Sequence, residues 1–165
     1  MHAIFTRTSV RKFTAQPVEQ EKLEKILRAG FAAPSAVNQQ PWEFYVVKNH
    51  AKIAQLAKAS PYAGPAAEAP VVLVIVYRTT GLAAPELATI DCAIATENMW
   101  LALTDLGLGG VLLAIAPTPE RMAKVHEILG LPPDQQAFAL LPVGYPARVH
   151  PQQDRYDAAK VHVVE

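Results

Sequence analysis

The chain has 165 residues, of which 51% are hydrophobic and 18% charged, a composition that can form the core of one domain spanning residues 1–165. Its 15 basic and 15 acidic residues balance, which argues against a protein that binds nucleic acid or an anionic membrane. The single cysteine, Cys92, excludes an intrachain disulfide and lies in an apolar run, so we expect a small buried side chain rather than a catalytic thiol. No apolar run is long enough for a membrane span, and the expected location is the cytoplasm.

Helical and strand patterns alternate along the first half of the chain. Apolar residues at helical spacing predict a helix over 18–29, which Gly30 would end. β-Branched and aromatic residues predict a strand over 43–47, and a weaker helical pattern covers 51–59. The run of Val, Leu and Ile over 71–77 predicts a strand that is buried on both faces.

The second half begins with the longest predicted helix, over 85–106. Its apolar residues cover nearly the whole circumference, so we expect it to be buried on all sides, between its own sheet and a second subunit. A strand over 111–115 follows, then a helix that starts at Pro119 and stops before Gly130. A last buried strand is predicted over 138–143.

The C-terminal segment 144–165 is polar and contains prolines, except for a short terminal strand predicted over 161–164. About twenty residues of mostly extended chain are unusual in a compact domain, which favours a tail that wraps a second subunit. Four or five strands with helices between them predict an α+β or α/β fold. The sequence contains no GxGxxG and no GxxxxGK[ST] motif, which excludes the Rossmann and P-loop ways of binding a nucleotide.

Near the N-terminus, Arg7, Ser9 and Arg11 occupy alternate positions, which point the same way in extended chain. Two guanidiniums and a hydroxyl on one side can bind a phosphate or another anion. The alternative is a solvated basic edge. In the tail, Arg155 is either a further cation for a phosphate or a surface arginine.

The segment 34–42 is rich in neutral hydrogen-bonding groups and bracketed by prolines. Asn38 and Gln40 offer donors and acceptors that suit a flavin edge or ribityl chain better than a metal, although a polar loop before a strand would look the same. Glycines over 107–110 either allow the backbone to approach a planar ligand or end a helix. The five histidines are scattered without metal-ligand spacing, so no metal site is predicted.

Taken together and in this order, these segments resemble the FMN-dependent nitroreductase family. The resemblance rests on Arg7, Ser9 and Arg11, the run Pro-Ser-Ala-Val-Asn-Gln-Gln-Pro-Trp over 34–42, the glycines before the strand at 111–115, and Gly-Tyr-Pro over 144–146. It implies an α+β fold with a central mixed, mostly antiparallel sheet flanked by helices. It also implies an intertwined homodimer in which the C-terminal tail is exchanged onto the partner.

The resemblance further implies that FMN lies at the dimer interface and contacts both chains. Arg7 and Arg155 would bind the phosphate, Ser9 and Arg11 would lie near the pyrimidine edge and ribityl chain, and segment 34–38 would come from the partner. The glycines would lie near N5, the hydride-accepting atom. The cofactor-binding residues predicted in this way are Arg7, Thr8, Ser9, Arg11, Pro34, Ser35, Ala36, Asn38, Gln40, Gly109, Gly110 and Arg155.

The activity implied is hydride transfer from NAD(P)H through flavin N5 to a small organic acceptor such as a nitroaromatic or a quinone. Donor and acceptor would share one site in turn, which predicts ping-pong kinetics, and the flavin rather than a protein side chain would carry the chemistry. The chain is short for the family, so the acceptor pocket is expected to be open, with Pro61 and Tyr62 as a partial cover. The alternatives are an FMN-binding storage or regulatory protein without turnover, a flavin-fragmenting or dehalogenating family member, and a purely structural dimer.

Overall fold

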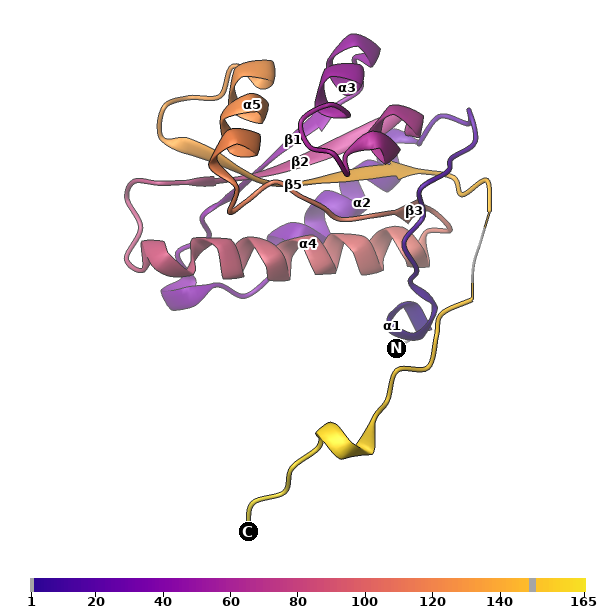
Figure 1. The fold of residues 1–165 in the computed structure, drawn as a ribbon, viewed down its shortest axis with the longest axis vertical. Helices are drawn as coiled ribbons and strands as arrows, with labels where there is room; N and C mark the ends of the chain where they lie inside the picture. The colour runs from indigo at the N-terminus through magenta and orange to yellow at the C-terminus, as the bar shows by residue number, and fades with distance from the viewer. Residues whose placement is uncertain (1, 149–150) are drawn as a thin grey trace.

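The computed structural model describes residues 2–148 and 151–165, so residues 149 and 150 of the tail lie outside the described part. A central sheet separates two helical layers (Figure 1). One layer contains α3 (His50–Leu56) and α5 (Pro119–Leu129), and the other contains α2 (Gln20–Phe31) and the long α4 (Ala88–Asp105). The α+β prediction is confirmed.

The sheet is antiparallel in every strand pair that the described residues form. A parallel element appears as an isolated bridge between Ser9 and Gly110, so the sheet is mixed and mostly antiparallel, as predicted. The strands run in the order β1 (Trp42–Val47), β2 (Val71–Arg78), β5 (Gln135–Gly144) and β3 (Gly109–Gly110), and β4 (Leu113–Ala114) also pairs with β5.

Strand β2 supplies both cores of the molecule, which explains its uninterrupted apolar sequence. Val72, Val74 and Val76 pack on the side of α3 and α5, whereas the alternate residues pack on the side of α2 and α4. All residues from 71 to 76 are buried. Because side chains alternate along a strand, a strand covered on both faces needs an apolar residue at every position.

The predicted strand over 111–115 is divided in two, because β3 and β4 are separate short strands. The register is the same on both sides of the gap, with Gly110 opposite Val143 and Leu113 opposite Leu140. Val111 therefore lies opposite Pro142, whose nitrogen carries no hydrogen to donate to the ladder.

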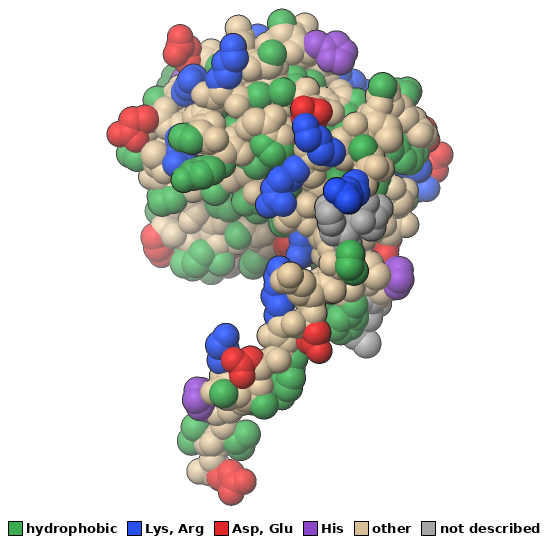
Figure 2. Space-filling view, turned by 45° about the vertical axis from the view of Figure 1, so that its right-hand side comes forward, with side chains coloured by type: hydrophobic (Ala, Val, Ile, Leu, Met, Phe, Trp, Pro, Cys, Tyr) green, Lys and Arg blue, Asp and Glu red, His purple; other side chains and the backbone are tan. Residues whose placement is uncertain are grey.

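The terminal strand predicted over 161–164 is wrong. The described tail contains a short 3₁₀ turn at Ala158–Lys160 and no strand after it. Within one chain this segment has no neighbouring strand, because the tail runs away from the body (Figures 1 and 2). A further difference is the short helix α1 (His2–Thr6), which the sequence patterns did not predict and which contacts α4.

Helix α4 is only partly buried in the single chain. Cys92 and Met99 are fully buried in the core, whereas Ile90 and Ile94 are 55% and 37% exposed. The burial on all sides that the sequence predicted therefore needs a second molecule, and the dimer stays a prediction. No helix in the described ranges is both long and apolar enough to cross a bilayer.

The N-terminal segment packs closely against β3. The backbone nitrogen of Val10 donates to the carbonyl of Gly110 over 2.9 Å. A Cβ added to Gly109 would lie 2.6 Å from Cγ2 of Val10, and one added to Gly110 would lie 2.8 Å from the carbonyl oxygen of Pro142. Both glycines are buried. Gly109 is required for the close approach of Val10, and Gly110 for the close approach of Pro142 in β5.

We expect Gly109→Ala to lower the free energy of unfolding by about 1–3 kcal/mol, the usual cost of overpacking. Adding Val10→Ala should recover part of that loss, because the two side chains compete for one space. Gly64→Ala is the control, since a Cβ there meets nothing within 4 Å. Urea unfolding checks all of these variants, and an unchanged midpoint for Gly109→Ala would contradict the packing described.

Candidate functional site

A hollow of about 450 Å³ lies beside Arg11. Its walls come from the N-terminal segment, the loop between α3 and β2, the segment around β4, and α5. The lining residues are Arg11, Tyr62, Pro65, Val111, Leu112, Leu113, Ala114 and Arg121. Segments far apart in the sequence therefore meet at one place.

The hollow carries positive charge and no negative charge. Within the described part of the chain, neither Arg11 nor Arg121 has a carboxylate within 4.0 Å. The guanidinium of Arg121 lies over the ring of Tyr62, with Cζ 5.6 Å from the ring centroid. Two guanidiniums beside apolar and backbone walls suit a planar ligand with anionic groups.

Arg7 has different surroundings from Arg11. Its Cζ lies 4.2 Å from the ring centroid of Trp100, and its Nε lies 3.6 Å from Glu97. Burial raises the pKa of the Glu97 carboxyl above its ordinary value, and the Arg7 guanidinium opposes that shift. Arg7 Nη1 and Trp100 Nε1 are buried without a hydrogen-bond partner in the described residues. Arg7 and Arg11 are thus not brought to the same hollow.

The loop over 34–41 is held by a buried carboxylate that the sequence analysis did not assign to the site. Asp91 is only 2% exposed and accepts from the backbone nitrogen of Ala36 at 2.9 Å and from Gln39 Nε2 at 2.7 Å. The Gln39 side chain also bonds the backbone of Ala84 in both directions, each at 2.9 Å. An acidic residue among the apolar residues of the first turns of α4 was the available signal for this contact.

The remaining predicted site residues are distributed over three regions. Pro34, Ser35, Ala36, Asn38 and Gln40 share the loop held by Asp91, where the Ser35 hydroxyl accepts from the backbone nitrogen of Gln40 at 3.0 Å. Thr8 and Ser9 are half-buried, and Ser9 bridges to Gly110. Gly109 is buried against Val10 and Gly110 against Pro142, so neither lines the hollow, and Arg155 is exposed on the tail. One chain alone does not assemble the predicted set.

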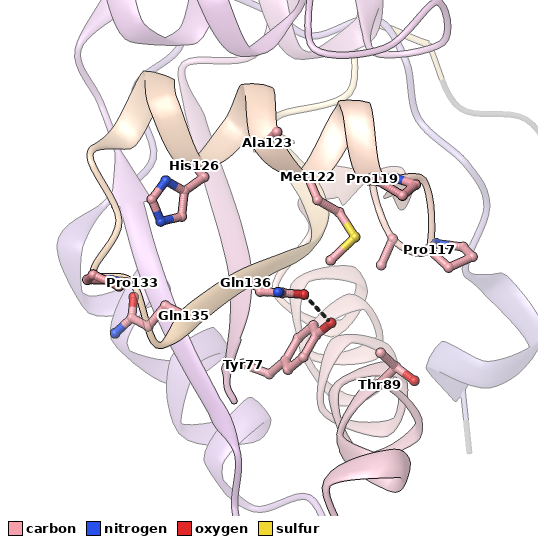
Figure 3. Close-up of a pocket in the computed structure, with 11 residues that line it drawn as sticks. Tyr77, Thr89, Pro117, Pro119, Met122, Ala123, His126, Pro133, Gln135 and Gln136 are labelled. Atoms are coloured by element: carbon pink, nitrogen blue, oxygen red, sulfur yellow. Dashed lines mark hydrogen bonds between the residues drawn. The ribbon is translucent and has the colours of Figure 1, made fainter. Parts of the chain in front are cut away.

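A larger hollow of about 600 Å³ lies elsewhere, between α5, the end of β2 and the start of α4 (Figure 3). The hydroxyl of Tyr77 donates to Gln136 Oε1 at 3.1 Å in this hollow. None of the predicted site residues lines it, and neither do acidic, Lys or Arg side chains. Of the two hollows, only the smaller one is lined by a residue of the predicted set, Arg11.

Cys92 takes no part in either hollow. The side chain is fully buried, as predicted, and burial raises the pKa of its thiol to about 12. A thiol with that pKa stays protonated at neutral pH and is a poor nucleophile. Across the described ranges, no group of three or more His, Cys, Asp and Glu side chains could hold a metal ion.

We expect Asp91→Asn to lower the free energy of unfolding by about 1–3 kcal/mol, because Ala36 and Gln39 donate to different carboxylate oxygens and Asn replaces one of these with an amino group, which leaves one donor unpaired. Asp105→Asn, at the exposed end of the same helix, should change it by less than about 0.5 kcal/mol. Urea unfolding of both variants checks this. Equal urea midpoints for Asp91→Asn and Asp105→Asn would mean that Asp91 does not hold the loop.

The fold and the smaller hollow define an α+β protein with a positively charged hollow beside β4 of a mostly antiparallel sheet. Comparison with known proteins identifies the class further. The sequence profile of the nitroreductase family matches residues 4–65 and 61–145. The chain belongs to the nitroreductase family, and the resemblance noted in its motifs is confirmed.

Similar proteins cover nearly the whole chain. A Methanothermobacter thermautotrophicus protein provisionally named NADH dehydrogenase/NAD(P)H nitroreductase is 32% identical over 99% of this chain and 85% of its own length. The NADPH-flavin oxidoreductase of Vibrio harveyi is 31% identical over 88% of this chain and 65% of its own. The structure of an FMN-dependent nitroreductase from Clostridium difficile R20291 has a TM-score of 0.93 and 26% identity, covering 100% of this chain and 99% of that one.

Proposed function

We propose that this nitroreductase-family protein binds FMN beside Arg11 and transfers a hydride from NAD(P)H to a small organic acceptor such as a nitroaromatic or a quinone. The observation that carries the proposal is the hollow in which Arg11 lies without a carboxylate partner among the described residues. The similar proteins named for flavin and FMN chemistry support the same cofactor.

The residues present fit FMN. When bound, FMN would supply the hydride-accepting atom N5 and the redox chemistry. Arg11 would supply a fixed cation to the reduced pyrimidine ring, on which negative charge develops, an electrostatic stabilisation that needs no reorganisation of the site. Segment 111–114 gives the isoalloxazine an apolar wall that ends in the small side chain of Ala114. Arg7 has a donor, Nη1, without an acceptor among the described residues, as a phosphate-binding guanidinium requires before its ligand arrives.

The proposal includes a homodimer, because the loop over 34–40 and Arg155 do not line the hollow of their own chain. A second copy would bring its loop to the hollow and receive the tail. The exposed Ile90 and Ile94 on α4, and Val163 and Val164 on the tail at 79% and 94% exposure, support this arrangement, because apolar groups of this size favour burial. Sedimentation equilibrium at micromolar concentration tests it, and a monomer would contradict it.

The visible absorption spectrum of the purified protein, recorded before and after addition of NADH or NADPH under nitrogen, tests the function. A flavin spectrum that bleaches supports the proposal, and parallel initial-rate lines with a quinone or nitroaromatic would support the ping-pong scheme. A flavin spectrum that does not bleach favours a storage or regulatory protein. No flavin, even after FMN is added, excludes the proposal.

Arg7→Ala should weaken FMN binding by about 1.5–3 kcal/mol, the range for a hydrogen bond to a charged group. The matched control is Arg28→Ala, since Arg28 is exposed on α2 and paired with Glu24. Fluorescence titration of the apoprotein with FMN measures both affinities. Thermal unfolding is recorded alongside, because Arg7 also packs on Trp100. An unchanged affinity in a folded Arg7→Ala variant would remove Arg7 from the site.

A further inference from the structure

The hollow contains a second guanidinium, Arg121, which the proposed contacts of the flavin do not use. Arg121 comes from the first turn of α5, where its backbone nitrogen donates to the carbonyl of Thr118 at 3.1 Å. Its side chain is half-buried and lies over the ring of Tyr62, whereas Tyr62 itself is 73% exposed. One side of the hollow is therefore formed by a cation held against an aromatic ring.

No acidic side chain compensates this charge within the described residues. Arg121 has no carboxylate within 4.0 Å, and the lining of the hollow contains neither Asp nor Glu. A partly desolvated guanidinium without a partner favours an anionic ligand, because its N–H groups form stronger hydrogen bonds to a charged acceptor than to water or a neutral group. Arg11 and Arg121 together add to the positive potential that such a ligand meets.

We propose that Arg121 and Tyr62 form a subsite for the anionic group of the acceptor, so that the enzyme prefers aromatic acceptors that carry a carboxylate or a similar anion. This inference rests on the proposed function, since it names the class of acceptor used at the same hollow. The apolar side chain of Pro65 accommodates the ring of the acceptor, and Arg121 receives its charge. Tyr62 is a positioning residue that holds Arg121.

An anionic group on the nicotinamide nucleotide or on FMN has the same chemistry, so the experiment must distinguish these sources. The acceptors 4-nitrobenzoate and 4-nitrobenzamide have similar shape and differ in charge. The kinetic constants for NADH and NADPH and the FMN content of each variant report separately on the nucleotide and the flavin. Lys124 supplies the matched control, because it lies three positions further along α5, points its amine at the carbonyl of Lys58 at 2.7 Å, and does not line the hollow.

For the wild-type holoenzyme we expect a higher kcat/KM with 4-nitrobenzoate than with 4-nitrobenzamide. Arg121→Gln should lower kcat/KM for 4-nitrobenzoate by about tenfold or more, the effect of losing one charge-assisted hydrogen bond, and should change the value for 4-nitrobenzamide by less than about twofold. Arg121→Lys should restore part of the preference, and Tyr62→Leu should reduce it. Lys124→Gln should leave the ratio of the two acceptors unchanged.

A second readout does not depend on turnover. Benzoate and benzamide are titrated into the purified protein, with and without FMN added, and followed by amide chemical shifts in NMR spectra. Tighter binding of benzoate than benzamide in the wild type, and loss of that difference in Arg121→Gln, support the subsite.

Several results would overturn the inference. In Arg121→Gln these are an equal loss of kcat/KM for both acceptors, a raised KM for NADH or NADPH with an unchanged ratio of the two acceptors, or a loss of FMN. In the wild type, the contradicting result is equal affinity for benzoate and benzamide. A wild-type protein that binds no FMN defeats the proposed function instead, and the benzoate titration still decides whether Arg121 recognises an anion.

Discussion

The position of Arg11 depends on how closely Val10 approaches β3. At position 109 only a residue without a Cβ allows this approach, which is why Gly109 stands there. The backbone contact of Val10 with Gly110 is continued by further bonds, in which the nitrogen of Thr14 donates to Tyr145 and that of Ala147 donates to Lys12. The N-terminal segment is thereby fixed between the edge of the sheet and the chain that follows β5. Arg11, the residue after Val10, is consequently directed to the hollow beside β4.

The three arginines near this site differ because their neighbours differ. Arg7 is packed on Trp100 and paired with Glu97, so part of its charge is already compensated inside the chain. Arg11 and Arg121 have no such partner in the described residues, and a ligand that brings negative charge to the hollow meets both of them. This difference between the arginines comes from the geometry of their neighbours.

The sequence predicted those parts of the fold that depend on local pattern. The helix at α2 and the doubly buried strand β2 follow from apolar spacing, which each segment carries in itself. The division between β3 and β4 does not follow from local pattern, because it arises from Pro142 in the neighbouring strand β5. The prediction of a terminal strand over 161–164 failed for a related reason. A strand forms only beside a second strand, and the described tail has none beside it in its own chain.

The residues of the candidate site could also be predicted from the sequence only in part. The motif residues 7–11 and 34–40 were found because their types and order resemble a family. Gly109 and Gly110 were predicted to lie near the ligand, which stays a prediction. The packing of Gly109 against Val10 could not be predicted, because only the folded chain reveals that neighbour. Arg121 and Asp91 were missed as site residues because each gains its role from a contact with a segment far away in the sequence: Arg121 stacks on Tyr62, and Asp91 binds Gln39.

The loop over 34–41 and the tail differ in how much conformational freedom each would lose on binding a second chain. In the loop, Val37, Asn38 and Gln40 have positive φ angles of 46°, 57° and 46°, and for β-branched Val37 this conformation is strained. Such strain persists only where surrounding contacts fix the backbone, and here the bonds from Ala36 and Gln39 to Asp91 do so. A loop fixed in this way loses little conformational entropy on binding, whereas the exposed tail loses more. In the proposed dimer the loop would therefore contribute the specific part of the contact, and the tail would have to bury Val163 and Val164 to offset the cost of its own ordering.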